Sequence, residues 1–372
     1  MAELLREVFS TPNIEKLAAR VKNSYKPFDC EAFLADAVKN QKENNYGLRL
    51  EQITDSLYKH LPSDYETTLP ILIKSLTDEL EVTEDFKFRN VHFINLAQGR
   101  YISKYGLEHF ELSMNGLKEM TKTFTAEYDI RYFLERYPSK ALNMLKQWAD
   151  SENVHVRRLA SEGTRPRLPM GRRNQQFVKD PEPIIPILEK LKNDPALYVR
   201  RSVANSLNDI SKDHPDMAAD IAERWINEGF ENSEWVCRHA MRSLFKSGHK
   251  KALSISGFPE PEGINVWGLN IKYTTLKLGD KLEFTFVMDN TSEKELNIMV
   301  DFEILFVKSN KKLSPKVFKL KKTVIKPGEV INLSGRHPLR ESTTRKHYTG
   351  RHLLRVMVNG RRSAPAAFYL QA

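Results

Sequence analysis

The chain has 372 residues, more than one typical hydrophobic core holds, so the sequence predicts two or three domains. No apolar run approaches the length of a membrane span, and the charged N-terminal residues lack the apolar core of a signal peptide. Cys30 and Cys237 lie far apart in no metal-ligand spacing. We therefore expect a soluble cytoplasmic protein with free thiols, and neither a membrane segment nor a zinc site, other metal or cofactor.

Positive charge is concentrated in the last third of the chain. Residues 264–372 carry 20 Lys and Arg against 9 Asp and Glu, whereas the first 263 residues carry 38 against 39. A basic module joined to a neutral one favours an additional contact with phosphate groups. Solubility alone would explain the same excess equally well.

Apolar residues recur with helical spacing through the first two thirds of the chain. No segment there alternates with period two, so the region is predicted to be all-α. We expect helices over residues 3–9, 14–21, 30–38, 67–80, 90–105 and 107–124, then shorter ones over 125–137, 139–150 and 153–162.

The shorter helices are related to one another in sequence. The triplets that begin at Val156, Val199 and Val236 align, and they are 43 and 37 residues apart. This spacing is typical of paired-helix repeats of the HEAT or armadillo type. Such helix pairs stack into a curved solenoid, because one pair cannot bury its apolar face alone.

The alignment predicts a polar surface of the solenoid. Arginines fall in one column and a second polar column follows one helical turn later; the two columns are Arg158, Arg201 and Arg238, then Glu162, Asn205 and Arg242. Asp209 continues the line of Arg201 and Asn205. A groove lined in this way would bind a nucleic-acid backbone without reading bases. Arginines that brace neighbouring repeats through carboxylates are the alternative.

The last third reads as strands. After a linker at 257–263, segments 282–288, 296–307, 317–324, 330–333, 353–358 and 366–370 are rich in apolar and β-branched residues and are separated by turns. This pattern predicts an immunoglobulin-like antiparallel sandwich. The predicted domains are a HEAT-like α-solenoid over 1–256, the linker, and the β-sandwich over 264–372.

The segment 153–173 combines a short helix with a basic loop. Val156 and Leu159 are spaced to face a core, while Arg158 and Glu162 share the opposite face. Gly163 ends the helix, and two prolines prevent another start. The segment holds six arginines and one glutamate, a composition that favours binding to an anionic polymer.

The motif RRLASEGTRPRLP within an α-solenoid, followed by an immunoglobulin-like tail, resembles the AlkC branch of the AlkC/AlkD DNA-glycosylase family. The resemblance covers essentially the whole chain and is most specific over 157–169 and 199–215. It implies a protein that wraps double-stranded DNA and excises 3-methyladenine, 3-methylcytosine or 1-methyladenine. It also implies that the lesion does not enter a conventional nucleobase pocket. We expect a monomer.

Breaking an N-glycosidic bond develops positive charge on the sugar, which a nearby carboxylate can stabilise. The candidate catalytic residues are Asp209, which matches the family motif, Glu127 and Glu162. Asp209 is expected to lie bare in a cationic channel. Glu127 could instead oppose a helix dipole or pair with Arg131, and Glu162 could simply pair with Arg158.

Arg158, Arg165 and Arg167 are expected to contact phosphates around the lesion, together with Arg201, Arg238 and Arg242 of the columns. Met170 stands where relatives carry a tryptophan, so the lesion contact is predicted to lose a π face. Trp148 and Trp225 lie on apolar stripes and are expected in the core. In the tail, we expect the loop 335–350, with Arg340, Arg345 and Lys346, to contact DNA. The alternative is that these residues are ordinary surface charges without a DNA contact.

Two functions remain open on the sequence. One is the glycosylase, and the other is a non-catalytic α-solenoid that binds nucleic acid or an acidic protein. The candidate carboxylates separate them.

Overall fold

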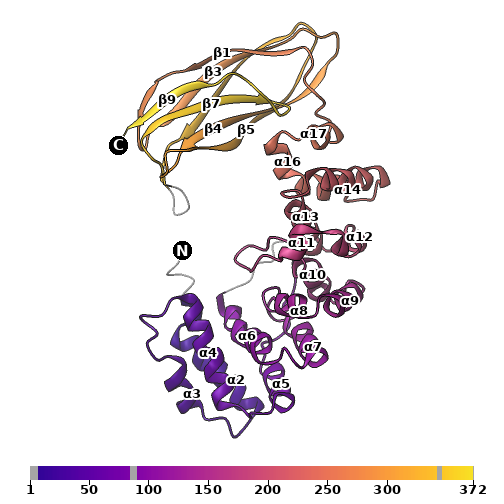
Figure 1. Ribbon diagram of the computed structural model, residues 1–372, viewed down its shortest axis with the longest axis vertical. Helices are drawn as coiled ribbons and strands as arrows, with labels where there is room; N and C mark the ends of the chain where they lie inside the picture. Colours follow the sequence, from indigo (N-terminus) through magenta and orange to yellow (C-terminus); the bar gives the residue numbers. More distant parts are fainter. Residues whose placement is uncertain (1–6, 84–89, 342–345, 372) are drawn as a thin grey trace. The chain divides into compact units, whose positions relative to one another are not determined.

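The computed structural model describes residues 7–83, 90–341 and 346–371. Helices fill the chain as far as Ile255 and strands follow from Ile264, so the predicted order of helices and then a sandwich is confirmed (Figure 1). Contacts divide the chain into two compact units. The helical unit is Met1–Asp213 with Gly229–Ala240, and the mixed unit is His214–Glu228 with Met241–Ala372.

The helical unit is a series of short helices joined by tight turns. Its elements are η1 (Glu7–Phe9), α2 (Thr11–Ser24), α3 (Cys30–Ala37), α4 (Tyr46–His60), α5 (Tyr65–Lys74), η2 (Asn90–Asn95), α6 (Leu96–Tyr105), α7 (Phe110–Met120), α8 (Ile130–Arg136), α9 (Pro138–Trp148), α10 (Val154–Glu162), α11 (Gln175–Lys179), η3 (Glu182–Ile184), α12 (Ile185–Leu191), α13 (Leu197–Ile210) and α15 (Ser233–Ala240). Side chains that accept backbone N–H bonds cap several of these helices; Asp29, Asn45 and Asp64 do so for α3, α4 and α5.

Several predicted helices differ from the structure. The helix expected over residues 67–80 ends at Lys74, and α4 was not among the predicted segments. Of the segment 3–9, only the 3₁₀ turn η1 lies within the described residues. The helix expected from residue 125 begins only at Ile130. The reason is local, because the Thr125 hydroxyl accepts a hydrogen bond from the Glu127 N–H (3.3 Å) and holds this segment in a turn.

The repeat alignment is confirmed by burial. Val156 on α10, Val199 on α13 and Val236 on α15 are each fully buried, and α13 packs against both α10 and α15. Equivalent positions of successive repeats therefore face the same core, as stacked helix pairs require.

The mixed unit joins three helices to the sandwich. The helices are α14 (Pro215–Glu228), α16 (Arg242–Ser247) and α17 (Lys250–Ile255). The strands are β1 (Ile264–Ile271), β2 (Thr275–Lys277), β3 (Lys281–Asn290), β4 (Leu296–Val307), β5 (Leu313–Ile325), β6 (Val330–Pro338), β7 (Gly350–Val358), β8 (Arg361–Arg362) and β9 (Ala366–Gln371). They form one sheet in the order β1-β3-β6 and a second in the order β2-β9-β7-β4-β5, with β8 paired to β7.

The six predicted strands are present, and their inward residues form a shared apolar core between the sheets. Strand β1 was not predicted, because its register shifts between Trp267 and Asn270 and only its two ends are buried. The predicted loop 335–350 begins inside β6, so its first residues lie on a strand.

Two glycines of the mixed unit bring a helix end against a strand turn. Gly248 ends α16 in the left-handed region (φ 80°), and Gly360 lies in the turn after β7 (φ 84°). A Cβ on Gly248 would lie 2.8 Å from the carbonyl oxygen of Gly360. The two backbones therefore touch where neither position has room for a side chain. Among the described residues, no helix is long and apolar enough to cross a membrane.

Candidate functional site

The site is built around α10, which is fixed at both ends. The Asn153 side chain accepts hydrogen bonds from the N–H groups of His155 (3.0 Å) and Val156 (3.3 Å). Val156 and Leu159 are fully buried, as predicted from their spacing. Where α10 ends at Gly163, a Cβ would lie 2.7 Å from a methyl group of Ile130, so the end of α10 lies close against α8.

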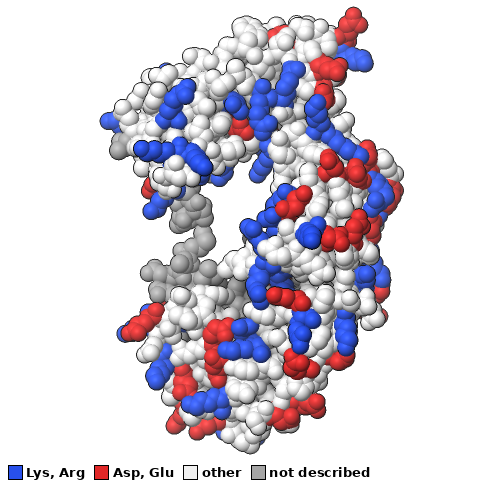
Figure 2. Space-filling model, in the orientation of Figure 1, with Lys and Arg blue, Asp and Glu red and all other residues white. Residues whose placement is uncertain are grey.

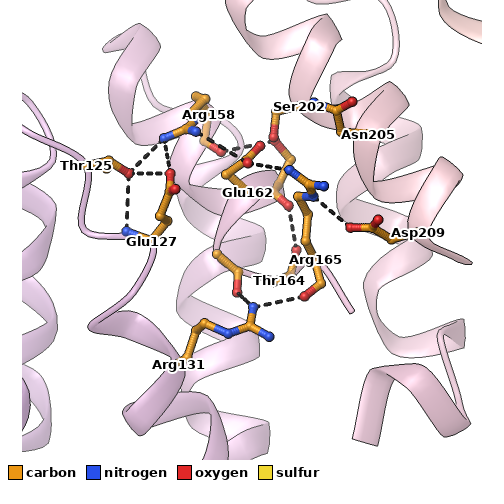
Figure 3. Close-up of polar contacts among 12 residues, drawn as sticks. Thr125, Glu127, Arg131, Arg158, Glu162, Thr164, Arg165, Ser202, Asn205 and Asp209 are labelled. Carbon is orange, nitrogen blue, oxygen red and sulfur yellow. Dashed lines mark hydrogen bonds and ion pairs between the residues drawn. The ribbon is translucent and has the colours of Figure 1, made fainter. Parts of the chain in front are cut away.

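Five side chains from three segments form one ion-pair chain (Figure 3). Arg158 of α10 contacts Glu127, in the turn before α8, at 2.5 Å and Glu162 at 3.4 Å. Arg165, in the loop after α10, contacts Glu162 at 2.6 Å and Asp209 of α13 at 2.8 Å. The three predicted carboxylates therefore lie in one cluster and alternate with two arginines.

All five members of the ion-pair chain are buried, with between 1% and 9% of each residue exposed. Burial alone would raise the pKa of the Glu162 carboxyl, but the charges of Arg158 and Arg165 outweigh it and lower that pKa. Burial alone would likewise lower the pKa of each arginine, yet the neighbouring carboxylates raise it. Glu162 is therefore ionised at neutral pH, which suits it to stabilise positive charge rather than to donate a proton.

Other groups around this chain were not predicted. The Thr125 hydroxyl donates to Glu127 (2.6 Å) and accepts from Arg158 (2.7 Å). The Arg158 guanidinium lies over the Tyr198 ring, 5.1 Å from its centroid. Ser202 is a hydrogen-bond partner of Glu162. The only sequence signal for Thr125 is its position two residues before Glu127.

The expectation of a bare Asp209 is wrong. Asp209 is 1% exposed, and it contacts Lys212 (2.8 Å) as well as Arg165. Helical spacing placed it in line with the exposed Arg201, but the C-terminal half of α13 is buried, and this helix packs against both α10 and α15. Asp209 nevertheless lies inside the ion-pair chain and not apart from it (Figure 3).

The structure also shows which of the proposed partners the two glutamates have. Glu127 lies in a turn before α8, so it cannot act on a helix dipole as a member of the first turn. Arg131 does not pair with Glu127; it donates to the carbonyl oxygens of Gly163 (3.0 Å) and Arg165 (2.9 Å). Burial lowers the pKa of Arg131 to about 10. The Glu162–Arg158 pair is present.

The arginines predicted to contact DNA differ in their exposure. Arg158 and Arg165 are buried on carboxylates, so the expectation that Arg158 is presented beside Arg201 and Arg238 is wrong for the protein without DNA. Arg167 holds both carboxylate oxygens of Asp213, at 2.7 and 2.6 Å. Arg201 and Arg238 are exposed, whereas Arg242 is half-buried at the start of α16, in the mixed unit.

Met170, in the loop after α10, is 75% exposed and has a left-handed backbone (φ 60°). Trp148 and Trp225 are buried, as predicted.

In the mixed unit, Arg340 and Lys346 are exposed, whereas Arg345 lies outside the described residues. Figure 2 shows Lys and Arg gathered near the loop after α10 and spread over the visible face of the sandwich.

Comparisons with known proteins agree with this architecture. The family model "DNA alkylation repair enzyme" matches residues 120–244, and the model of the C-terminal Ig-like domain of YhaZ matches residues 265–372. The uncharacterized protein YhaZ of Bacillus subtilis (strain 168) is 36% identical over 96% of each chain. The solved structure of Pseudomonas fluorescens alkylpurine DNA glycosylase AlkC, bound to DNA containing an abasic site analog, is 35% identical over 99% of each chain, with a TM-score of 0.87. The present chain belongs to the AlkC-like DNA alkylation repair enzyme family, with a C-terminal YhaZ-type Ig-like domain.

Proposed function

We propose that this protein is a DNA glycosylase that excises cationic N-alkylated bases, such as 3-methyladenine, 3-methylcytosine and 1-methyladenine, from double-stranded DNA. Membership of the family supports a role in alkylation repair. The observation that carries the proposal is an ionised Glu162 held between two arginines, in one chain with Glu127 and Asp209.

The proposed reaction needs no proton donor. Alkylation of a ring nitrogen makes the base cationic, so the electron pair of the breaking glycosidic bond neutralises the base as it leaves. The sugar becomes oxocarbenium-like, and a water adds to its anomeric carbon and loses a proton. A carboxylate beside the sugar stabilises the positive charge and can orient that water. The lowered pKa of Glu162 fits this role.

The three carboxylates differ in access. The side chains of Glu127 and Glu162 are 9% and 7% exposed, against 1% for Asp209. We therefore assign the direct contact with the sugar to Glu127 and Glu162. Asp209 reaches the sugar only when Arg165 changes partner, and a DNA phosphate is a suitable competing partner for that guanidinium. Until then Asp209 positions Arg165, and through it Glu162.

The proposed partner is duplex DNA. Exposed cations of the helical unit, Arg201 and Arg238, and Arg167 beside Asp213 would bind its backbone. Met170 would contact the region of the lesion. In the mixed unit, Arg340 and Lys346 would add phosphate contacts.

The test is single-turnover release of 3-methyladenine and 3-methylcytosine from duplex DNA. Glu127→Gln, Glu162→Gln and Asp209→Asn should each slow release by about 10²–10³-fold, with duplex affinity changed little. Exposed Glu135→Gln is the matched control and should release base at the wild-type rate. Melting curves of every variant separate a lost reaction from a lost fold, because a cation left unpaired in the cluster is destabilising.

The outcome of the wild-type reaction decides between the two functions. If the wild-type protein binds duplex DNA and releases neither base, the glycosylase proposal fails and a non-catalytic nucleic-acid-binding solenoid remains.

A further inference from the structure

The hydroxyl group of Thr125 lies in the turn before α8, at the Glu127 end of the ion-pair chain, and the residue is 3% exposed. It takes part in three hydrogen bonds (Figure 3). It donates to Oε2 of Glu127 (2.6 Å), accepts from Nη1 of Arg158 (2.7 Å) and accepts from the backbone N–H of Glu127 (3.3 Å). A hydroxyl group has one proton and two lone pairs, so these contacts use all of its hydrogen-bonding capacity.

The chemistry of the partners fixes the direction of these bonds. A guanidinium group only donates hydrogen bonds, so the Thr125 hydroxyl accepts from Arg158 and its single proton points to the carboxylate of Glu127. Arg158 Nη1 itself contacts Oε2 of Glu127, at 2.5 Å. One neutral donor and one cationic donor therefore hold the same carboxylate oxygen.

Glu127 is not held by a helix, because α8 begins only at Ile130. Thr125 instead binds both the backbone N–H and the carboxylate of Glu127, which closes a ring of contacts around this one side chain. Rotation of the side chain would break the contacts of Oε2 with Thr125 and Arg158. The orientation of the second oxygen, Oε1, therefore follows from the hold on the first.

We propose that Thr125 is a positioning residue of the reaction: it holds the Glu127 carboxylate in the orientation in which that group stabilises the sugar and orients the water. The inference rests on the proposed function for the reaction in which Glu127 takes part, but the contact itself does not depend on catalysis. The alternative is a role in the fold alone, since the hydroxyl also satisfies buried donors of the turn and of α10.

Two substitutions separate the hydroxyl group from the shape of the side chain. Thr125→Val keeps nearly the same shape without the hydroxyl, and Thr125→Ser keeps the hydroxyl. Thr54→Val is the matched control, because Thr54 is fully buried on α4 and its hydroxyl donates to the carbonyl oxygen of Leu50 (2.8 Å), outside the ion-pair chain. The control removes a buried hydroxyl without touching a carboxylate.

The experiment measures single-turnover release of 3-methyladenine from duplex DNA by the full-length protein, together with duplex affinity and melting temperature. Thr125→Val should slow release about 10–100-fold at saturating protein, because a misplacement of about 1 Å costs on the order of 10²-fold. Its duplex affinity should not change. Thr125→Ser should release base at close to the wild-type rate, and Thr54→Val should lower the melting temperature without slowing release.

A double variant tests whether Thr125 acts through Glu127. In a Glu127→Gln background, Thr125→Val should slow release no further, because the carboxylate that it positions is already absent. A purely structural role would slow both backgrounds by the same factor.

A readout without DNA reports on the contact itself. In protein labelled with ¹³C at the glutamate carboxyl groups, the NMR signal that disappears in Glu127→Gln belongs to Glu127. Thr125→Val should shift this signal, whereas Thr125→Ser should leave it near its wild-type position.

The outcomes separate this inference from the proposed function. Release by Thr125→Val at the wild-type rate, or equal slowing in the two backgrounds, overturns the inference and leaves the glycosylase intact. An unshifted Glu127 signal also overturns it. If wild type releases no base while Thr125→Val shifts the signal, the glycosylase proposal fails and the hold of Thr125 on the carboxylate stands.

Discussion

The replacement Asp129→Asn should stabilise the protein by an amount that grows with pH. Burial raises the pKa of Asp129 from 3.8 to about 7, against the opposing effects of the Ser103 hydrogen bond and the Arg100 charge. Because the pKa of the folded state lies above that of the unfolded state, the stability contributed by the protonated carboxyl is complete below about pH 4. It is lost as the pH rises to about 7.

The magnitude follows from the size of this shift. At 1.36 kcal/mol per pKa unit, ionised Asp129 costs about 4 kcal/mol above pH 7, and about 3 kcal/mol of this develops between pH 5 and pH 8. Asparagine keeps an oxygen for Ser103 and does not ionise. The melting temperature of Asp129→Asn relative to wild type should therefore rise by about 6–12 °C between these pH values, at about 2–4 °C per kcal/mol.

Thermal melts followed by circular dichroism at pH 5, 6, 7 and 8 provide the assay. Asp150→Asn is the control, because the Asp150 side chain is 61% exposed and pairs with Lys190 at the surface. If the difference between Asp129→Asn and wild type stays constant over this range, or follows that of the control, Asp129 does not ionise across this window and the reasoning fails.

Three further predictions concern single contacts. Arg165→Met should lower the free energy of unfolding of the helical unit in urea by about 3–5 kcal/mol, because it leaves two buried carboxylates without their cation. Arg167→Met breaks a more exposed pair and should lower it by about 1 kcal/mol or less. Equal losses for the two variants would contradict the ion-pair chain. Arg340→Gln should reduce the slope of log affinity for duplex DNA against log salt by about 1; an unchanged slope would remove Arg340 from the interface. Gly248→Ala should cost about 1–3 kcal/mol more in thermal or urea unfolding than Gly257→Ala, which has a similar φ but open space around it, and a difference near zero would show that the backbone contact is loose.

Local patterns predicted most of the elements, because helical and alternating periodicity can be recognised within a short stretch of sequence. They missed α4 and placed the end of α5 six residues too late. The Arg158–Glu162 pair could also be predicted from the sequence, since both side chains lie on one face of α10. The Arg165–Asp209 pair spans 44 residues and depends on how α10 and α13 stack. The sequence could therefore nominate Asp209 but could not show that a cation covers it.

The strand β1 and the turn at Glu127 escaped prediction for related reasons. A register shift within β1 interrupts the alternation by which strands are recognised. At Glu127, one threonine hydroxyl competes with the helix for the backbone and delays α8.

The close contact of Gly248 and Gly360 has a consequence for how this module could be exchanged between proteins. A cut in the stretch between α17 and β1 would separate the backbones of Gly248 and Gly360, which are in direct contact. It would also remove the sandwich from α16 and α17, which belong to the same compact unit. A transplantable cassette would have to keep α16 and α17 together with the sandwich and therefore start before Arg242. Recombination or engineering that cuts where helices change to strands would transfer the sandwich without the helices that pack against it.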